Sequence, residues 1–179
     1  MQTMRRNSVV NLLIAAVIAT AVCLLDQISK MAVVGSMALG ESRELIPGVL
    51  NLTYIRNSGM AMGMLANHRW IFMALSVIMI ALIILYVTFS RSVKRGTVVV
   101  LAMILGGGIG NMIDRFAYGF VIDFIDVRLF GNLWKWIFNV ADSFVTVGAV
   151  VLAVIYIVSE VRKKKQGKSE EEAKAENDL

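Results

Sequence analysis

The sequence has little charge, one proline, one cysteine and one histidine, and these shortages exclude several classes of protein. Charged residues make up 17% of the chain, whereas a soluble domain carries about 25%. Hydrophobic residues make up 58% of it. An ordinary soluble globular domain is therefore excluded, and the composition predicts a membrane protein.

The single cysteine and the single histidine limit the chemistry further. Cys23 lies in the first apolar run and has no second cysteine for an internal disulfide. Together with His68, 45 residues away, it cannot supply the usual ligand count of a zinc site. The pair also argues against a Ser-His-Asp or Cys-His enzyme. We expect no metal and no cofactor.

Four uncharged apolar runs approach the length that crosses a bilayer, roughly 17 to 25 residues; they cover residues 7–25, 70–90, 96–113 and 143–159. They predict an all-α integral membrane protein with four transmembrane helices, folded as a single domain over residues 1–162. Residues 163–179 are rich in Lys and Glu and predict a disordered cytoplasmic tail.

The basic residues near the span ends predict that both termini are cytoplasmic. On that topology 11 of the 18 basic residues and six of the 13 acidic residues lie inside, so the whole net charge of +5 is internal. The basic clusters are short and have no interleaved aromatic residues. They favour contact with membrane lipids, and nucleic acid is not expected as a partner.

Two outer segments join the spans. In the first, residues 49–56 alternate in polarity and predict a strand in a small β-rich platform. Met60, Met62 and Met64 then fit either an adaptable apolar groove or packing against the membrane. The second segment, residues 116–138, is expected to lie along the membrane surface as an interfacial segment with an aromatic belt; its aromatic residues are Phe130, Trp134, Trp136 and Phe138.

The third span ends in a glycine cluster formed by Gly106, Gly107, Gly108 and Gly110. Glycines at this spacing let helix backbones approach closely in a bilayer. A phosphate-binding loop would need a preceding strand and a following Gly-Lys-Ser/Thr, and the sequence has neither. The cluster therefore predicts close helix packing.

Several acidic residues at the span ends have ordinary explanations. Asp26 and Lys30 stand four residues apart and fit an ion pair at a helix end. Asp114 fits an ion pair with its neighbour Arg115. Asp126 is expected to face solvent. Asp142 fits a helix cap, an interpretation that stays open beside a catalytic one.

After these exclusions, the chemistry that remains possible is that of carboxylates. Two acids would hold a water molecule between them. The best pair is Asp123 and Asp142. Asp123 lies in the apolar run Val-Ile-Asp-Phe-Ile, where burial should raise its pKa. Asp142 lies at a helix N-terminus, which favours the charged form. Opposed environments of this kind suit acid and base roles.

Five segments in order along the chain carry a family resemblance: Asp-Gln-Ile-Ser-Lys at 26–30, Asn-Ser-Gly-Met-Ala-Met-Gly at 57–63, and residues 107–115, 121–123 and 138–143. With these five segments the chain resembles the lipoprotein signal peptidases, the type II signal peptidases of bacteria. The resemblance implies four helices in the cytoplasmic membrane and an aspartyl protease site near its outer surface. Such a site cuts the signal peptide of a diacylglyceryl-modified prolipoprotein before the lipidated cysteine.

The resemblance also implies residue roles. Asp123 and Asp142 would be the catalytic pair, and four residues would bind substrate or position the pair: Asn57, Asn111, Arg115 and Asn139. Met62 departs from the family, which usually has an aromatic residue there, and this bears on the shape of the substrate groove. We expect a monomer.

Two other classes of function stay open from the residues alone. A small transporter or proton relay would also place acids in a helical bundle, although the acids here gather at one membrane edge. A structural subunit of a larger membrane complex would use the glycine-rich helix as its interface and the aspartates as caps.

Overall fold

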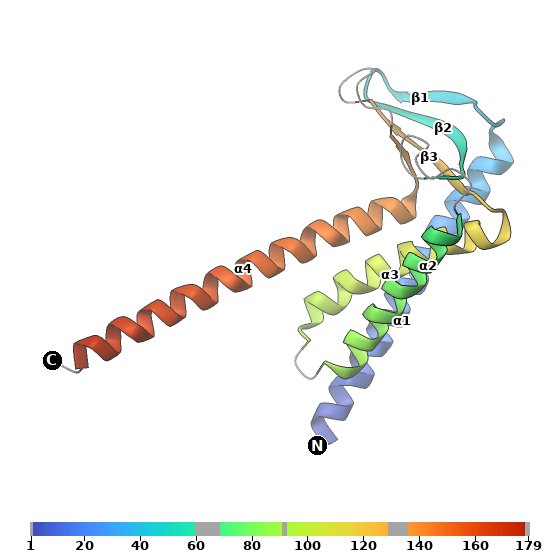
Figure 1. Ribbon diagram of the computed structural model, residues 1–179. Helices are drawn as coiled ribbons and strands as arrows, with labels where there is room; N and C mark the ends of the chain where they lie inside the picture. The colour runs from blue at the N-terminus through green and yellow to red at the C-terminus, as the bar shows by residue number, and fades with distance from the viewer. Residues whose placement is uncertain (1, 60–68, 91–92, 129–135, 178–179) are drawn as a thin grey trace.

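The structure is a computed structural model that describes residues 2–59, 69–90, 93–128 and 136–177. Its helices are α1 (Gln2–Ser36), α2 (Arg69–Phe89), α3 (Arg95–Ala117) and α4 (Val140–Asn177). Its strands are β1 (Ser42–Ile46), β2 (Leu50–Asn57), β3 (Val121–Val127) and β4 (Ile137–Phe138). The sheet covers one end of the helices, and both chain termini lie far from it (Figure 1).

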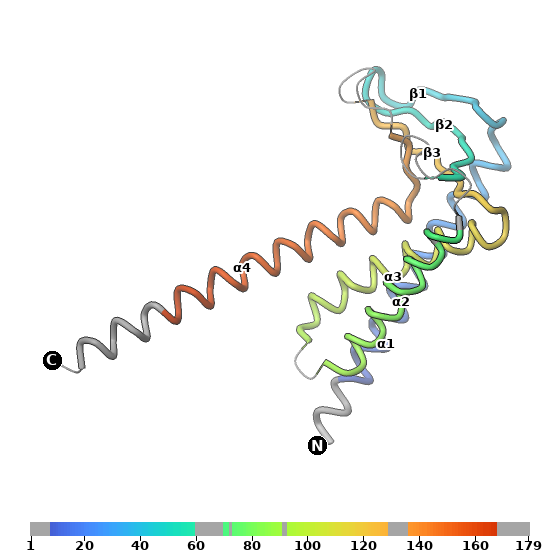
Figure 2. Tube along the Cα trace, viewed as in Figure 1, coloured from blue at the N-terminus to red at the C-terminus, as the bar shows by residue number. Residues whose placement is uncertain are grey.

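Helix α3 is the centre of the helical part. It packs against α1, α2 and α4, and its inward face forms the core with apolar side chains of α1 and α2. Helix α4 meets α3 near the sheet and then diverges from the other three helices (Figure 2). Large apolar side chains on the outward faces of all four helices are exposed, as expected for helices that contact lipid.

Three described helical segments are long and apolar enough to cross a membrane: Ser8–Ser36, Arg95–Ala117 and Val140–Gly167. Helix α2 has 21 residues, and its apolar part among the described residues is the shorter Met73–Phe89. The prediction of membrane helices is therefore confirmed for three segments, and a count of four stays a prediction. The first helix extends well beyond the predicted end at residue 25, because the charges that follow are paired inside the protein.

The sheet is antiparallel with strand order β1-β2-β3-β4. The predicted strand at 49–56 is confirmed as β2. Of the described part of residues 116–138, β3 and β4 belong to the same sheet as β1 and β2, which local sequence did not predict. That this segment lies along the membrane surface stays a prediction. Strand β3 is nearly all buried and pairs with β2 across more than sixty residues of sequence. Only tertiary pairing brings together the segment between α1 and α2 and the segment between α3 and α4.

Asp126 is a correction in this segment. It was expected to face solvent, yet only 4% of its surface is exposed. It accepts hydrogen bonds from Thr53 Oγ1 at 2.8 Å and from the Arg128 guanidinium at 2.8 and 3.0 Å. The sheet covers this carboxylate and supplies its partners, which is why its local polarity was misleading.

The glycine cluster on α3 makes the close contacts that its spacing predicts. A Cβ atom on Gly106 would lie 2.6 Å from the carbonyl oxygen of Ala19 in α1. A Cβ atom on Gly107 would lie 2.5 Å from that of Ala141 in α4. Backbone carbonyls cannot move aside as a flexible side chain can. These glycines therefore set how closely α1 and α4 approach α3.

We expect Gly107→Ala to lower the amount and the thermal stability of folded protein, because the added methyl group overpacks a backbone contact. Overpacking of this kind typically costs about 1–3 kcal/mol. The matched control is Gly96→Ala in the same helix, where an added Cβ would meet nothing within 4 Å. Thermal unfolding in detergent measures both variants. Equal midpoints for the two would contradict the packing assignment.

The C-terminal residues also differ from expectation. Helix α4 continues without a break to Asn177, through the Lys- and Glu-rich stretch that was predicted to be disordered. Lys and Glu are good helix formers, and Lys163 pairs with Glu160 at 2.8 Å. The domain boundary at residue 162 stays a prediction. The predictions for Met60, Met62, Met64, His68, Phe130 and Trp134 lie outside the described residues.

Candidate active site

Asp123 lies in the middle of β3 with 1% of its surface exposed. Its Oδ2 atom accepts a hydrogen bond from Asn57 Nδ2 at 2.8 Å, and its Oδ1 atom accepts one from Asn139 Nδ2 at 2.7 Å. Asp123 pairs with Ile55 across the sheet. Asn57 is therefore its diagonal neighbour on the same face, since side chains two residues apart point the same way.

Asp142 is the third residue of α4, and Asn139 immediately precedes that helix. Asn139 Oδ1 accepts a hydrogen bond from the Asp142 backbone N–H at 2.8 Å, and Asp142 Oδ2 accepts one from the Asn139 backbone N–H at 3.4 Å. This reciprocal arrangement is a capping box. The other oxygen of Asp142, Oδ1, accepts a hydrogen bond from Asn111 Nδ2 at 2.7 Å. Asp142 therefore takes part in the helix cap and also lies in the candidate site.

Asn139 connects the two carboxyl groups. It is completely buried, and its Nδ2 donates to Asp123 and also to Asn111 Oδ1 at 2.9 Å. Its Oδ1 caps α4 at Asp142. The start of α4 and the middle of β3 are thus held against each other by one side chain. This places the two acids within a single hydrogen-bonded network.

The pKa of Asp123 is raised to about 7. Burial of the carboxyl group is the main cause, and the nearby charge of Asp142 is the second. The hydrogen bonds from Asn57 and Asn139 favour the charged form and oppose this shift. Burial prevails here, because two neutral amide donors replace only part of the lost hydration of a carboxylate.

A buried ion cluster lies next to this network. Lys30 Nζ contacts Asp26 Oδ2 at 2.7 Å and Asp114 Oδ2 at 2.9 Å, and all three side chains are about 1% exposed or less. The expected Asp26–Lys30 ion pair is therefore confirmed, but it is buried and shared with Asp114. Asp26 Oδ1 also accepts the Ala141 backbone N–H at 2.9 Å and so helps to cap α4. The sequence predicted only the pair of Asp26 with Lys30. The contact with Asp114 could be seen only in the folded structure.

Arg115 follows Asp114 on α3 and is half-buried. Its guanidinium donates to the backbone oxygen of Asn111 at 3.5 Å. Asp114 Oδ2 makes an ion pair with Lys30, and Asp114 Oδ1 accepts a hydrogen bond from Gln27 Nε2 at 2.9 Å. Asp114 also accepts the Ile122 backbone N–H at 3.1 Å, which ties α3 to β3. Asp114 thus has a structural role among α1, α3 and β3.

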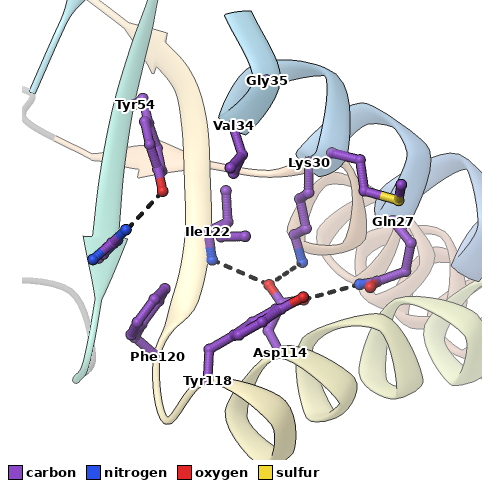
Figure 3. Close-up of a pocket in the computed structure, with 11 residues that line it drawn as sticks. Gln27, Lys30, Val34, Gly35, Tyr54, Asp114, Tyr118, Phe120 and Ile122 are labelled. Atoms are coloured by element: carbon purple, nitrogen blue, oxygen red, sulfur yellow. Dashed lines mark hydrogen bonds and ion pairs between the residues drawn. The ribbon is translucent and has the colours of Figure 1, made fainter. Parts of the chain in front are cut away.

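A cavity of about 340 Å³ lies beside the ion cluster (Figure 3). Its lining includes Lys30, Asp114, Tyr54, Phe120 and Ile122. Ile122 and Asp123 are consecutive on β3, so their side chains point to opposite faces of the sheet. The cavity therefore lies on the side of β3 away from the Asp123 carboxyl group. Among the described residues, no group of three or more His, Cys, Asp and Glu side chains gathers as metal ligands would.

The structure brings the predicted site residues together from four elements: Asn57 from β2, Asn111 and Arg115 from α3, Asp123 from β3, and Asp142 with Asn139 at the start of α4. A buried carboxyl group and a half-buried one, held by three amide side chains, can exchange protons with a molecule placed between them. That arrangement suits hydrolysis by general acid and general base catalysis.

Comparison with known proteins gives one consistent result. A family model described as "Signal peptidase (SPase) II" matches residues 18–158. The "Lipoprotein signal peptidase" of Listeria monocytogenes serotype 4a (strain HCC23) is 43% identical over 148 residues, which cover 83% of this chain and 95% of that protein. The protein of the same name from Streptococcus pyogenes serotype M6 (strain ATCC BAA-946 / MGAS10394) is 39% identical over 130 residues, covering 73% of this chain and 84% of that one.

Solved structures agree with this result. A structure titled "Bacterial membrane enzyme structure by the in meso method at 2.3 A resolution" superposes with a TM-score of 0.74 at 33% identity, covering 82% of this chain and 88% of that one. A second one, determined at 1.9 Å, gives 0.72 at 32% identity, with 79% and 91% covered. The family match covers α2, α3, the sheet and parts of α1 and α4. The chain is a bacterial membrane peptidase that belongs to the signal peptidase II family.

Proposed function

We propose that this protein removes the signal peptide from diacylglyceryl-modified prolipoproteins as an aspartic endopeptidase, cutting before the lipidated cysteine. Family membership supports the substrate class. The observation that carries the mechanism is the buried network in which Asn139 joins Asp123 to Asp142. No other pair of carboxyl groups among the described residues is linked in this way without a cation between them.

In the proposed mechanism Asp142 is ionised and acts as the general base, and Asp123 is protonated. Asp142 takes a proton from a water molecule, whose oxygen attacks the scissile carbonyl carbon. Asp123 gives its proton to the carbonyl oxygen, so that the tetrahedral intermediate is a neutral diol. On collapse Asp142 returns its proton to the leaving amine and Asp123 recovers one from the diol. Both acids end in their starting states.

The surroundings favour these assignments. Asp142 lies in the first turn of α4, where the helix dipole and the donor from Asn111 favour a negative charge. The raised pKa of Asp123 favours the protonated acid near neutral pH. Asn57, Asn111 and Asn139 hold the two carboxyl groups in fixed directions, and Arg115 would bind substrate or support Asn111.

The proposed location is the bacterial cytoplasmic membrane with both termini inside. The catalytic pair then lies near the outer surface, because Asp142 opens α4 and Asp123 lies in the sheet beyond the helices. This location would leave the acyl chains of a substrate in the bilayer while its peptide bond reaches the pair. The exposed apolar faces of α1 and α4 are compatible with such a bilayer position.

We expect cleavage to depend on the lipid attached to the substrate cysteine. Purified protein would be incubated with a diacylglyceryl-modified preprolipoprotein and with the same polypeptide lacking the lipid. The lipidated form should be cut before its cysteine and the other form should stay intact. An Asp123→Asn sample identifies any contaminating protease. Equal cleavage rates for the two substrates would contradict the proposed substrate class.

A further inference from the structure

Lys30 has more partners than an ion pair at a helix end requires. An ammonium group has three N–H donors and no acceptor. Two of the donors meet Asp26 and Asp114, and the third meets Asn111 Oδ1 at 3.1 Å. Figure 3 shows Lys30 extending from α1 toward Asp114. The third contact joins the ion cluster to the catalytic network.

The contact with Lys30 fixes which way the Asn111 carboxamide points. Because an ammonium group can only donate, the oxygen of the carboxamide must face Lys30, and its Nδ2 then faces Asp142. The flipped carboxamide would place N–H groups against the ammonium and an oxygen against the carboxylate. Both contacts would be repulsive.

We propose that Lys30 is a positioning residue for the reaction, which holds the Asn111 carboxamide so that its Nδ2 donates to Asp142. This inference rests on the proposed function. Lys30 does not itself reach the substrate in this proposal. It acts through Asn111 and keeps a donor on the general base.

Asn139 gives Asn111 a second support. Its Nδ2 donates to Asn111 Oδ1 at 2.9 Å, but the same Nδ2 also serves Asp123 Oδ1 at 2.7 Å and lies 3.4 Å from the Ile122 carbonyl oxygen. Two hydrogens are thus divided among three acceptors. Without Lys30, Asn111 would keep only this divided contact on its oxygen. We therefore expect a partial loss of activity when Lys30 is replaced.

The charge of Lys30 has a separate effect on the pair. The charges of Lys30 from α1 and of Asp142 from α4 act on Asp123, and those of Lys30 and of Arg115 from α3 act on Asp142. Lys30 lowers the pKa of Asp123, although less than burial raises it. Removing Lys30 should therefore move the alkaline limb of the pH–rate profile to higher pH.

The test compares Lys30→Met with Gln27→Met in the purified full-length protein. Gln27 lies on the same helix and touches the same cluster, through Asp114 Oδ1 at 2.9 Å and the Gly110 carbonyl oxygen at 3.2 Å. None of its hydrogen bonds reaches Asn111. Lys30→Met should lower kcat by about 10- to 100-fold, the size of loss seen when a residue that orients a metal ligand is removed, with KM little changed. The alkaline limb of its pH–rate profile should shift to higher pH, and that of Gln27→Met should not.

Lys30→Met leaves Asp26 and Asp114 without their cation and could therefore lower the stability of the fold. A second comparison controls for this effect. The double variant Lys30→Met/Asp114→Asn removes one charge of each sign and is compared with Asp114→Asn alone. Relative to Asp114→Asn, the double variant should show the same loss of kcat and the same shift of the alkaline limb to higher pH. An unchanged kcat together with an unchanged alkaline limb, in either comparison, would overturn the positioning role. Full activity of Asp123→Asn would instead overturn the proposed function, so the two failures are distinguishable.

Discussion

Asp123→Asn and Asp142→Asn should each reduce cleavage of lipidated substrate by roughly 10²- to 10⁴-fold, the usual cost of losing a positioned general acid or base. Asparagine keeps the shape of the side chain and cannot transfer the proton. The double variant should lose little more than either single one, because residues that act as a unit are strongly non-additive. Cleavage of a lipidated prolipoprotein by purified protein, normalised to folded protein, measures this.

The matched control is Asp126→Asn. Asp126 lies on the same strand as Asp123, is also buried, and bonds to Thr53 and Arg128. Its ion pair is with an exposed Arg128 side chain and should contribute little to stability. We expect near-normal cleavage for this variant. Near-normal cleavage by folded Asp123→Asn or Asp142→Asn would contradict the proposed aspartic mechanism.

The pKa of Asp123 sets the direction of the pH dependence. The native pKa of about 7 is above the ordinary carboxyl value of 3.8, so the folded protein holds this proton more tightly than the unfolded chain does. Because Asp123 is assigned as the proton donor, cleavage should fall as pH rises through about 7. The same proton stabilises the fold fully at acid pH, and this contribution declines as pH rises toward the native pKa. The measured limbs belong to the coupled pair.

Asn139→Asp should reduce cleavage by about 10²- to 10³-fold, the size expected when one preorganised donor is removed from an active site. Aspartate keeps the acceptor that caps α4 at the Asp142 backbone N–H, and Asp is as good a cap as Asn. It loses the Nδ2 donor to Asp123 and places a third carboxylate beside the pair. Activity should therefore fall while most of the folded protein remains.

Two variants separate this effect from helix capping. Asn139→Ala removes the cap as well and should also lose about 1 kcal/mol of stability. Ser143→Ala removes only a hydrogen bond from Ser143 Oγ to the Asn139 backbone oxygen in the same turn, and should cleave nearly normally. Thermal unfolding and cleavage are measured on all three. Wild-type cleavage by Asn139→Asp would show that Asn139 serves the helix alone.

Local sequence was sufficient to predict features that depend on one segment. Uncharged runs of sufficient length predicted the membrane helices, because backbone groups in hydrocarbon must be paired within the helix. The glycine spacing on α3 predicted close backbone contacts, which Gly106 and Gly107 make. The polarity of residues 49–56 predicted β2. The motifs around Asp123 and Asp142 identified the family, which the comparisons confirm.

Only the tertiary structure decided which polar groups meet. Strand β3 forms because β2 offers it an edge, and no local pattern specifies a partner more than sixty residues away. Asp126 was misjudged for the same reason, since its burial depends on that pairing. The four-residue spacing of Asp26 and Lys30 predicted their ion pair. The two further partners of Lys30, Asp114 and Asn111, lie on another helix and could not be predicted in this way. Sequence fixes the charge of such a group, but folding decides its solvation and its partners, and those set its chemistry.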